Sequence, residues 1–98
     1  MPAYLFQIDL SEITEEFEST IPVHRQYVNQ LFSTGTLLSY SVSLQRHAIW
    51  CVLNAETEQQ AMDYVVAFPL YGFFTDVVCN HLLFHHTQSV LLPDISLN

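Results

Sequence analysis

The sequence contains no lysine, and its only permanently positive side chains are Arg25 and Arg46. Ten carboxylates oppose them, so the formal net charge is −8 at pH 7. A nucleic-acid-binding surface needs several cations that neutralise phosphates, and this composition argues against that class of function. The same negative field slows the approach of any anionic ligand. Such a ligand would have to bind at one of the two arginines, at a protonated histidine or at a helix N-terminus.

Other features are also scarce. Cys51 and Cys79 are too few for a disulfide framework, so we expect reduced thiols in a cytoplasmic protein. No apolar run approaches the roughly 18–20 residues of a membrane span, and the start of the chain lacks the features of a signal peptide. The sequence also has no glycine-rich phosphate loop and no serine nucleophile elbow.

The composition that remains is that of a folded domain. The 98 residues are 50% hydrophobic and include seven Phe and five Tyr, which excludes a disordered tail. A chain of this length builds only a modest core, to which a partner subunit would add. We therefore expect one domain over residues 1–86, followed by a C-terminal arm over residues 87–98 that docks on a neighbouring subunit.

The hydrophobic pattern predicts four strands and two helices. Strands are expected at Ala3–Leu10, Leu37–Leu44, Ala48–Leu53 and Phe73–Phe84. The first helix follows the acidic segment that opens at Ser11 and Thr14, with Pro22 either kinking it or starting its main part, and Gly35 ends it. The second helix is capped by Thr57, with Gln60 at the reciprocal position, and stops before Pro69.

The order of these elements predicts a ferredoxin-like α+β fold, βαββαβ. Its four-stranded antiparallel sheet carries both helices on one face. The third and fourth strands have apolar residues at positions for both faces, so the uncovered face should meet something apolar. A second copy of the same sheet is the economical partner, which predicts a homodimer.

Several short motifs resemble muconolactone delta-isomerase. They are Gly35-Thr36-Leu37, the strand ending in Val52-Leu53-Asn54, the Thr57-capped helix, the run Ala67-Phe68-Pro69-Leu70-Tyr71, and His85 after the last strand. Each motif alone is weak, but their order and spacing cover residues 3–86. The resemblance implies a dimeric α+β barrel, often in larger rings of dimers, and a cofactor-free enzyme that shifts a proton in a small carboxylated lactone. Because the fold also carries other activities, it does not transfer this function by itself.

His24 is the first candidate for such chemistry. It falls on the apolar stripe of the first helix between Ile21 and Val28, so it should point inward as base or proton shuttle. The alternative is a histidine at the edge of the core that is bonded to a carbonyl. Arg25 is the candidate for holding a substrate carboxylate, and the alternative for it is a solvated surface charge.

Further candidates lie on the strands. Asp9 and Gln7 share the face of the first strand that would look toward the barrel. A buried Asp9 could act as a base there. The alternative is that Asp9 lies in solvent at the end of the strand. Gln7, Ser41 and Trp50 are assigned to the wall that contacts a ligand, with Ser41 in a row with Ser39 and Ser43. The serine row is equally compatible with the solvent face of an edge strand.

No metal or cofactor is expected. On one strand His81 and His85 would stand about 13 Å apart, which a single zinc ion cannot bridge. Two functions remain open: a cofactor-free isomerase acting by proton transfer on a small cyclic or lactone compound in the barrel cavity, and a non-catalytic dimeric module that binds a small ligand or a partner. A cavity with a titratable group and a convergent donor favours the first.

Overall fold

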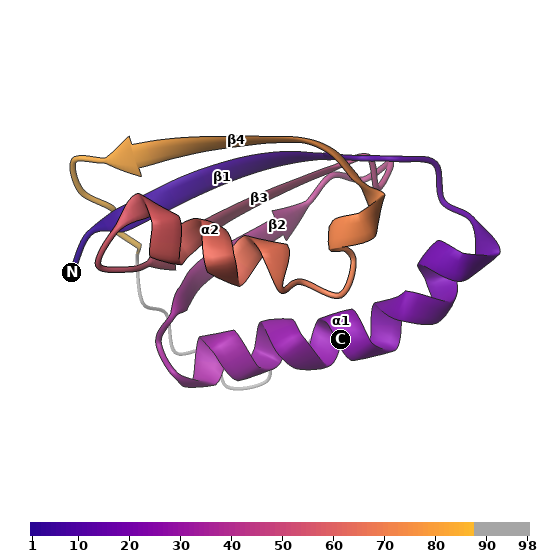
Figure 1. Ribbon diagram of the computed structural model, residues 1–98, viewed down its shortest axis with the longest axis horizontal. Coiled ribbons are helices and arrows are strands. Elements are labelled where there is room, and N and C mark those ends of the chain that lie inside the picture. Colours follow the sequence, from indigo (N-terminus) through magenta and orange to yellow (C-terminus); the bar gives the residue numbers. More distant parts are fainter. Residues whose placement is uncertain (88–98) are drawn as a thin grey trace.

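A computed structural model describes residues 1–87, and the expected docking arm therefore lies almost wholly outside the described residues. The elements follow one another in the expected order (Figure 1). They are β1 (Ala3–Leu10), α1 (Glu15–Ser33), β2 (Leu37–Val42), β3 (Ala48–Asn54), α2 (Glu58–Val66), the short 3-10 helix η1 (Tyr71–Phe73) and β4 (Phe74–Leu82).

The four strands form one sheet in the order β2-β3-β1-β4, and all neighbouring strands are antiparallel. Figure 1 shows α1 and α2 on the same side of this sheet. The structure thus confirms the predicted ferredoxin-like plan. Within the described residues, no helix is long and apolar enough to cross a membrane.

The core lies between the sheet and the two helices. Alternation along β1 turns Tyr4, Phe6 and Ile8 toward the helices, where all three are buried. In the register of the sheet they stand opposite the core residues Leu53, Cys51 and Ile49 of β3. The helices contribute Phe17, Val28, Leu31, Ala61 and Val65 to the same cluster.

Both helices begin at threonine caps. The Thr14 hydroxyl accepts a hydrogen bond from the Phe17 amide, and the Thr57 hydroxyl accepts one from the Gln60 amide. The Gln60 side chain accepts from the amide of Glu56, one residue before the position of a standard capping box. Pro22 lies inside α1, which continues through it as one helix. Gly35 has a φ of 76°, as expected of a left-handed cap.

Alternation along the expected strand Leu37–Leu44 predicts one apolar face made of Leu38, Tyr40, Val42 and Leu44, and the structure corrects this prediction. β2 ends at Val42, and Leu44 lies beyond it in the turn with 93% of its surface exposed. The register also shifts between Leu37 and Ser39, so Leu37 enters the core and Leu38, which alternation would have placed there, is only half-buried.

The face of the sheet that the helices leave uncovered combines apolar residues with a few polar ones. We call it the open face. Its β4 positions are Asp76, Val78, Asn80 and Leu82, so polar and apolar residues alternate on this face of the strand. Its β3 positions include Ala48, Trp50 and Val52, so β3 is apolar on both sides as predicted, and Trp50 is 38% exposed. Asp76 stands opposite Asp9 of β1, so one end of the open face carries two neighbouring carboxylates.

Candidate functional site

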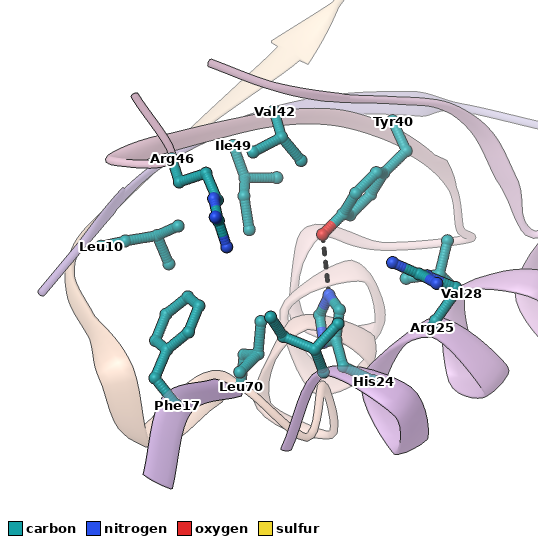
Figure 2. Close-up of a pocket in the computed structure, with 11 residues that line it drawn as sticks. Leu10, Phe17, His24, Arg25, Val28, Tyr40, Val42, Arg46, Ile49 and Leu70 are labelled. Atoms are coloured by element: carbon teal, nitrogen blue, oxygen red, sulfur yellow. Dashed lines mark hydrogen bonds between the residues drawn. The ribbon is translucent and has the colours of Figure 1, made fainter. Parts of the chain in front are cut away.

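A pocket of about 490 Å³ opens between α1, β2 and the turn that joins β2 to β3 (Figure 2). Most of its wall is apolar, contributed by Leu10, Phe17, Ile21, Val28, Val42, Ile49 and Leu70. Its polar lining consists of His24, Arg25, Tyr40 and Arg46. An apolar pocket with a few converging polar groups is the usual form of a small-molecule site.

His24 and Tyr40 form the polar centre of this pocket. Nε2 of His24 lies 2.7 Å from the hydroxyl oxygen of Tyr40, and Figure 2 shows this hydrogen bond crossing from α1 to the sheet. His24 is only 5% exposed. Its other ring nitrogen, Nδ1, is buried and has no hydrogen-bond partner within the described residues. His24 is therefore bonded to a side-chain hydroxyl in the pocket wall. The alternative considered from the sequence was a histidine at the edge of the core that is bonded to a carbonyl.

Each of these two side chains is turned toward the space between α1 and the sheet by its position on its own element. His24 sits on the buried stripe of α1, one turn before Val28. Tyr40 stands opposite Cys51 in the sheet and so faces the helices. Phe68, which follows α2, packs against both rings, with centroid distances of 5.3 Å to His24 and 6.4 Å to Tyr40. These contacts with Phe68 restrict the positions of both the His24 and the Tyr40 ring.

Burial governs the protonation of the pair. Desolvation lowers the pKa of the His24 imidazole to about 4, so the ring is neutral at pH 7. Burial, followed by the influence of Cys51, raises the pKa of the Tyr40 phenol above its ordinary value, so its hydroxyl keeps its proton. Desolvation also raises the pKa of the Cys51 thiol to about 12, which makes it a poor nucleophile. The pair is thus a neutral imidazole and a neutral phenol.

The two arginines of the chain both line this pocket. Arg25 belongs to α1 and Arg46 to the turn between β2 and β3, and both are exposed. In Figure 2, Arg46 extends from this turn into the space above Phe17 and beside Ile49. Among the described residues, the lining includes neither aspartate nor glutamate. The pocket is therefore a positive region of a strongly acidic protein.

The structure separates the residues that the sequence suggested. His24 and Arg25 lie together in the pocket. Gln7 and Ser41 both stand opposite Trp50 in the register of the sheet, so these three residues cluster on the open face. Asp9 lies on the same face and is exposed rather than buried. Only a second molecule on the open face could make that cluster part of a cavity wall.

Tyr40 is a pocket residue that sequence reasoning did not select, and Arg46 was named only as one of the two arginines at which an anion could bind. A signal for Tyr40 was present, because it is the polar aromatic residue on the strand face that points toward the helices. A signal for Arg46 was its rarity, since it is one of two cations in the chain. Their contact with the His24 region depends on packing between α1 and β2, which spacing along the chain does not reveal.

The remaining histidines lie elsewhere. His81 stacks on Tyr4 with ring centroids 4.5 Å apart, and Nε2 of His85 lies 2.8 Å from the Thr87 hydroxyl. Among residues 1–87, no three His, Cys, Asp or Glu side chains are grouped as metal ligands would be.

Comparison with known proteins shows a likeness of fold. Neither the scan of protein-family models nor the search of curated proteins found a match. Among solved structures, the chain is similar to 5-chloro-2-hydroxyhydroquinone dehydrochlorinase (TftG) from Burkholderia phenoliruptrix AC1100, determined in complex with 2,5-dihydroxybenzoquinone. The TM-score is 0.68 at 13% sequence identity, over 89% of this chain and 96% of the other. At this identity the likeness concerns the fold alone.

Proposed function

We propose that the pocket binds a small cyclic organic molecule and that His24 and Tyr40 move a proton on it without a cofactor. The observation that carries this proposal is the 2.7 Å contact between His24 and Tyr40 in the wall of a pocket of about 490 Å³. An imidazole and a phenol within hydrogen-bond reach form a proton relay, and the apolar walls strengthen its electrostatic interactions. The reaction class is isomerisation by proton transfer next to a carbonyl.

The proposed relay consists of two coupled proton transfers. The phenolic oxygen of Tyr40 takes the proton from the carbon next to the carbonyl while its own proton passes to Nε2 of His24. The substrate becomes an enolate, and His24 becomes an imidazolium. Reversal of both transfers at a different carbon gives the isomer. The negative enolate favours the charged imidazole, which offsets the desolvation that keeps His24 neutral.

Two similarities support a small cyclic substrate. The motifs around Gly35 and Pro69 resemble muconolactone delta-isomerase, whose substrate is a lactone. The structure of similar fold belongs to an enzyme named for a chlorinated hydroquinone and contains a benzoquinone. Neither similarity identifies the substrate of this protein.

We also propose that the protein is a homodimer whose subunits meet at their open faces. Trp50 and Val78, which are 38% and 46% exposed, provide apolar contact area. The dimer would close a barrel around Gln7, Ser41 and Trp50. A larger ring of dimers and a cytoplasmic location stay predictions from the sequence.

The test is a screen of lactones, quinols and small aromatic acids with the wild-type protein and the variants His24→Gln and Tyr40→Phe. Each variant removes one partner of the relay, and we expect kcat/KM to fall at least about 100-fold in both. His81→Gln is the matched control, because it removes an imidazole that stacks on Tyr4 outside the pocket. Turnover that survives in both variants with an unchanged pH profile would refute the relay.

A non-catalytic binding module is the second candidate. It is favoured by the burial of Nδ1 and by the low basicity of His24. Its signature would be a ligand that binds without turnover, with His24→Gln altering the affinity alone.

A further inference from the structure

We infer that His24 carries its proton on Nε2 in the free protein, so that Tyr40 presents its own hydroxyl proton to the pocket. Tyr40 then selects ligands that place an uncharged hydrogen-bond acceptor against its hydroxyl group. This inference rests on the ligand pocket proposed above and names the ligand group that Tyr40 would recognise. It concerns the free protein and does not require the proton relay to operate.

The two ring nitrogens of His24 have different surroundings. Nε2 lies 2.7 Å from the hydroxyl oxygen of Tyr40. Nδ1 is buried and has no hydrogen-bond partner within the described residues, and His24 as a whole is only 5% exposed. A proton on Nε2 therefore has an acceptor within reach, whereas a proton on Nδ1 has none among residues 1–87.

This difference decides between the two neutral forms of the ring. A neutral imidazole has one N–H donor and one bare acceptor nitrogen. Desolvation lowers the pKa of His24 to about 4, so the ring is neutral at pH 7. Among buried backbone groups, donors that lack an acceptor are rarer than acceptors that lack a donor. The same preference places the proton of His24 on Nε2 and leaves Nδ1 bare.

The tautomer of His24 fixes the role of the Tyr40 hydroxyl group. Its oxygen accepts the hydrogen bond from Nε2, so its own proton points away from His24. Burial raises the pKa of the Tyr40 phenol, so this proton is retained. In the described part of the chain, the hydroxyl has no hydrogen-bond partner besides His24. Figure 2 shows its oxygen at the tip of a ring that extends from the sheet into the lined space.

The apolar wall makes this donor selective. Phe17, Val28, Ile49 and Leu70 line the same pocket and carry no side-chain acceptor for the hydroxyl proton. A ligand without an acceptor would exclude water from the hydroxyl and leave it unpaired, which costs more than a typical hydrogen bond gains. A ligand with an acceptor at this position avoids that cost.

The same inference sets a condition on the proposed relay. The relay transfers a proton to Nε2 of His24, which must be bare at that moment. It therefore proceeds from the form with the proton on Nδ1, which is the minor form in the free protein. Its rate falls with the population of that minor form.

Nitrogen NMR of the isotope-labelled protein at pH 7 tests the tautomer directly, because protonated and bare imidazole nitrogens resonate at very different frequencies. We expect Nε2 of His24 to resonate as a protonated nitrogen and Nδ1 as a bare one. The His24 signals are assigned by their loss in His24→Gln. The reverse pattern, or averaged frequencies for the two nitrogens, would overturn the inference.

A second measurement compares acetophenone with 2-phenylpropene, in which a methylene group replaces the carbonyl oxygen, by NMR titration at millimolar concentrations. We expect Tyr40→Phe to weaken acetophenone binding about fivefold and to leave 2-phenylpropene binding unchanged, because only the ketone accepts the hydroxyl proton. The matched control is Tyr27→Phe. It removes the hydroxyl of another half-buried tyrosine, which donates to the Tyr64 carbonyl outside the pocket lining, and should change neither affinity.

The outcomes separate this inference from the relay. Equal losses for the two probes in Tyr40→Phe, or no binding of acetophenone to the wild-type protein, would refute the assigned role of Tyr40. A protonated Nδ1 together with turnover in the substrate screen would overturn the inference and leave the relay standing. A protonated Nε2 without turnover would support Tyr40 as a binding donor and count against the relay.

Discussion

His24 is a buried residue whose pKa is lowered by desolvation, so its ionisation affects the stability of the fold. Its folded-state pKa of about 4 lies below the ordinary value of 6.5, so the unfolded chain binds more protons between these two values. Stability from this group is therefore fully present above about pH 6.5 and is lost as the pH falls toward 4. The difference corresponds to about 3 kcal/mol of unfolding free energy.

We expect the free energy of unfolding of the wild-type protein to fall more steeply between pH 6.5 and 4 than that of His24→Gln. Urea titrations at a series of pH values measure both slopes. The comparison isolates His24, because every carboxylate and every other histidine is present in both proteins. Parallel slopes would show that His24 is not desolvated in the folded state.

Arg46 has a backbone conformation that is costly for a residue with a side chain. Its positive φ is paid for in conformational energy, and glycine would relieve that strain. We expect Arg46→Gly to raise the free energy of unfolding by up to about 1 kcal/mol, measured by urea denaturation. If Arg46→Gly destabilises the protein, the arginine side chain supports the fold by more than the strain costs.

At the scale of elements, the pocket depends on how the segment after α2 packs against α1 and β2. Phe68 is 2% exposed and contacts the rings of Tyr27, His24, Tyr40 and Phe74. The Tyr27 hydroxyl also donates to the Tyr64 carbonyl at 2.9 Å, which ties α1 to α2. The position of the His24–Tyr40 pair therefore follows from contacts among three elements.

We expect Phe68→Ala to cost about 3–5 kcal/mol of unfolding free energy, because it opens a cavity in this aromatic cluster. Val66→Ala, two residues earlier and at a side chain that is 47% exposed, is the control and should cost under about 0.5 kcal/mol. Thermal or chemical denaturation measures both. Similar small losses in the two variants would contradict the assigned packing of Phe68.

At the scale of the whole molecule, the sheet has a covered face and an open face. Trp50 and Val78 expose apolar surface on the open face, while Asp9 and Asp76 place two carboxylates together at one end. A self-contact would bury the apolar residues and leave the carboxylates near its rim, because an unpaired buried charge is costly.

We expect sedimentation velocity to show a dimer for the wild-type protein and a monomer for Trp50→Glu. The control is Leu44→Glu, which introduces the same charge at a residue in the turn beyond β2 that is 93% exposed. A wild-type monomer at micromolar concentration, or an intact Trp50→Glu dimer, would refute the proposed contact between open faces.

The sequence alone determined the order and type of the elements, because hydrophobic period, threonine caps and Gly35 are local signals of helix and strand. It also placed His24 on the inward stripe of α1 for the same reason. Only the tertiary structure decided that Leu37 replaces Leu38 in the core, since a bulge changes the alternation that sequence reasoning assumes. It alone brought Tyr40, 16 positions from His24, and Arg46 into one pocket. Contacts between distant elements depend on how whole faces pack, and residue spacing along the chain carries little information about that packing.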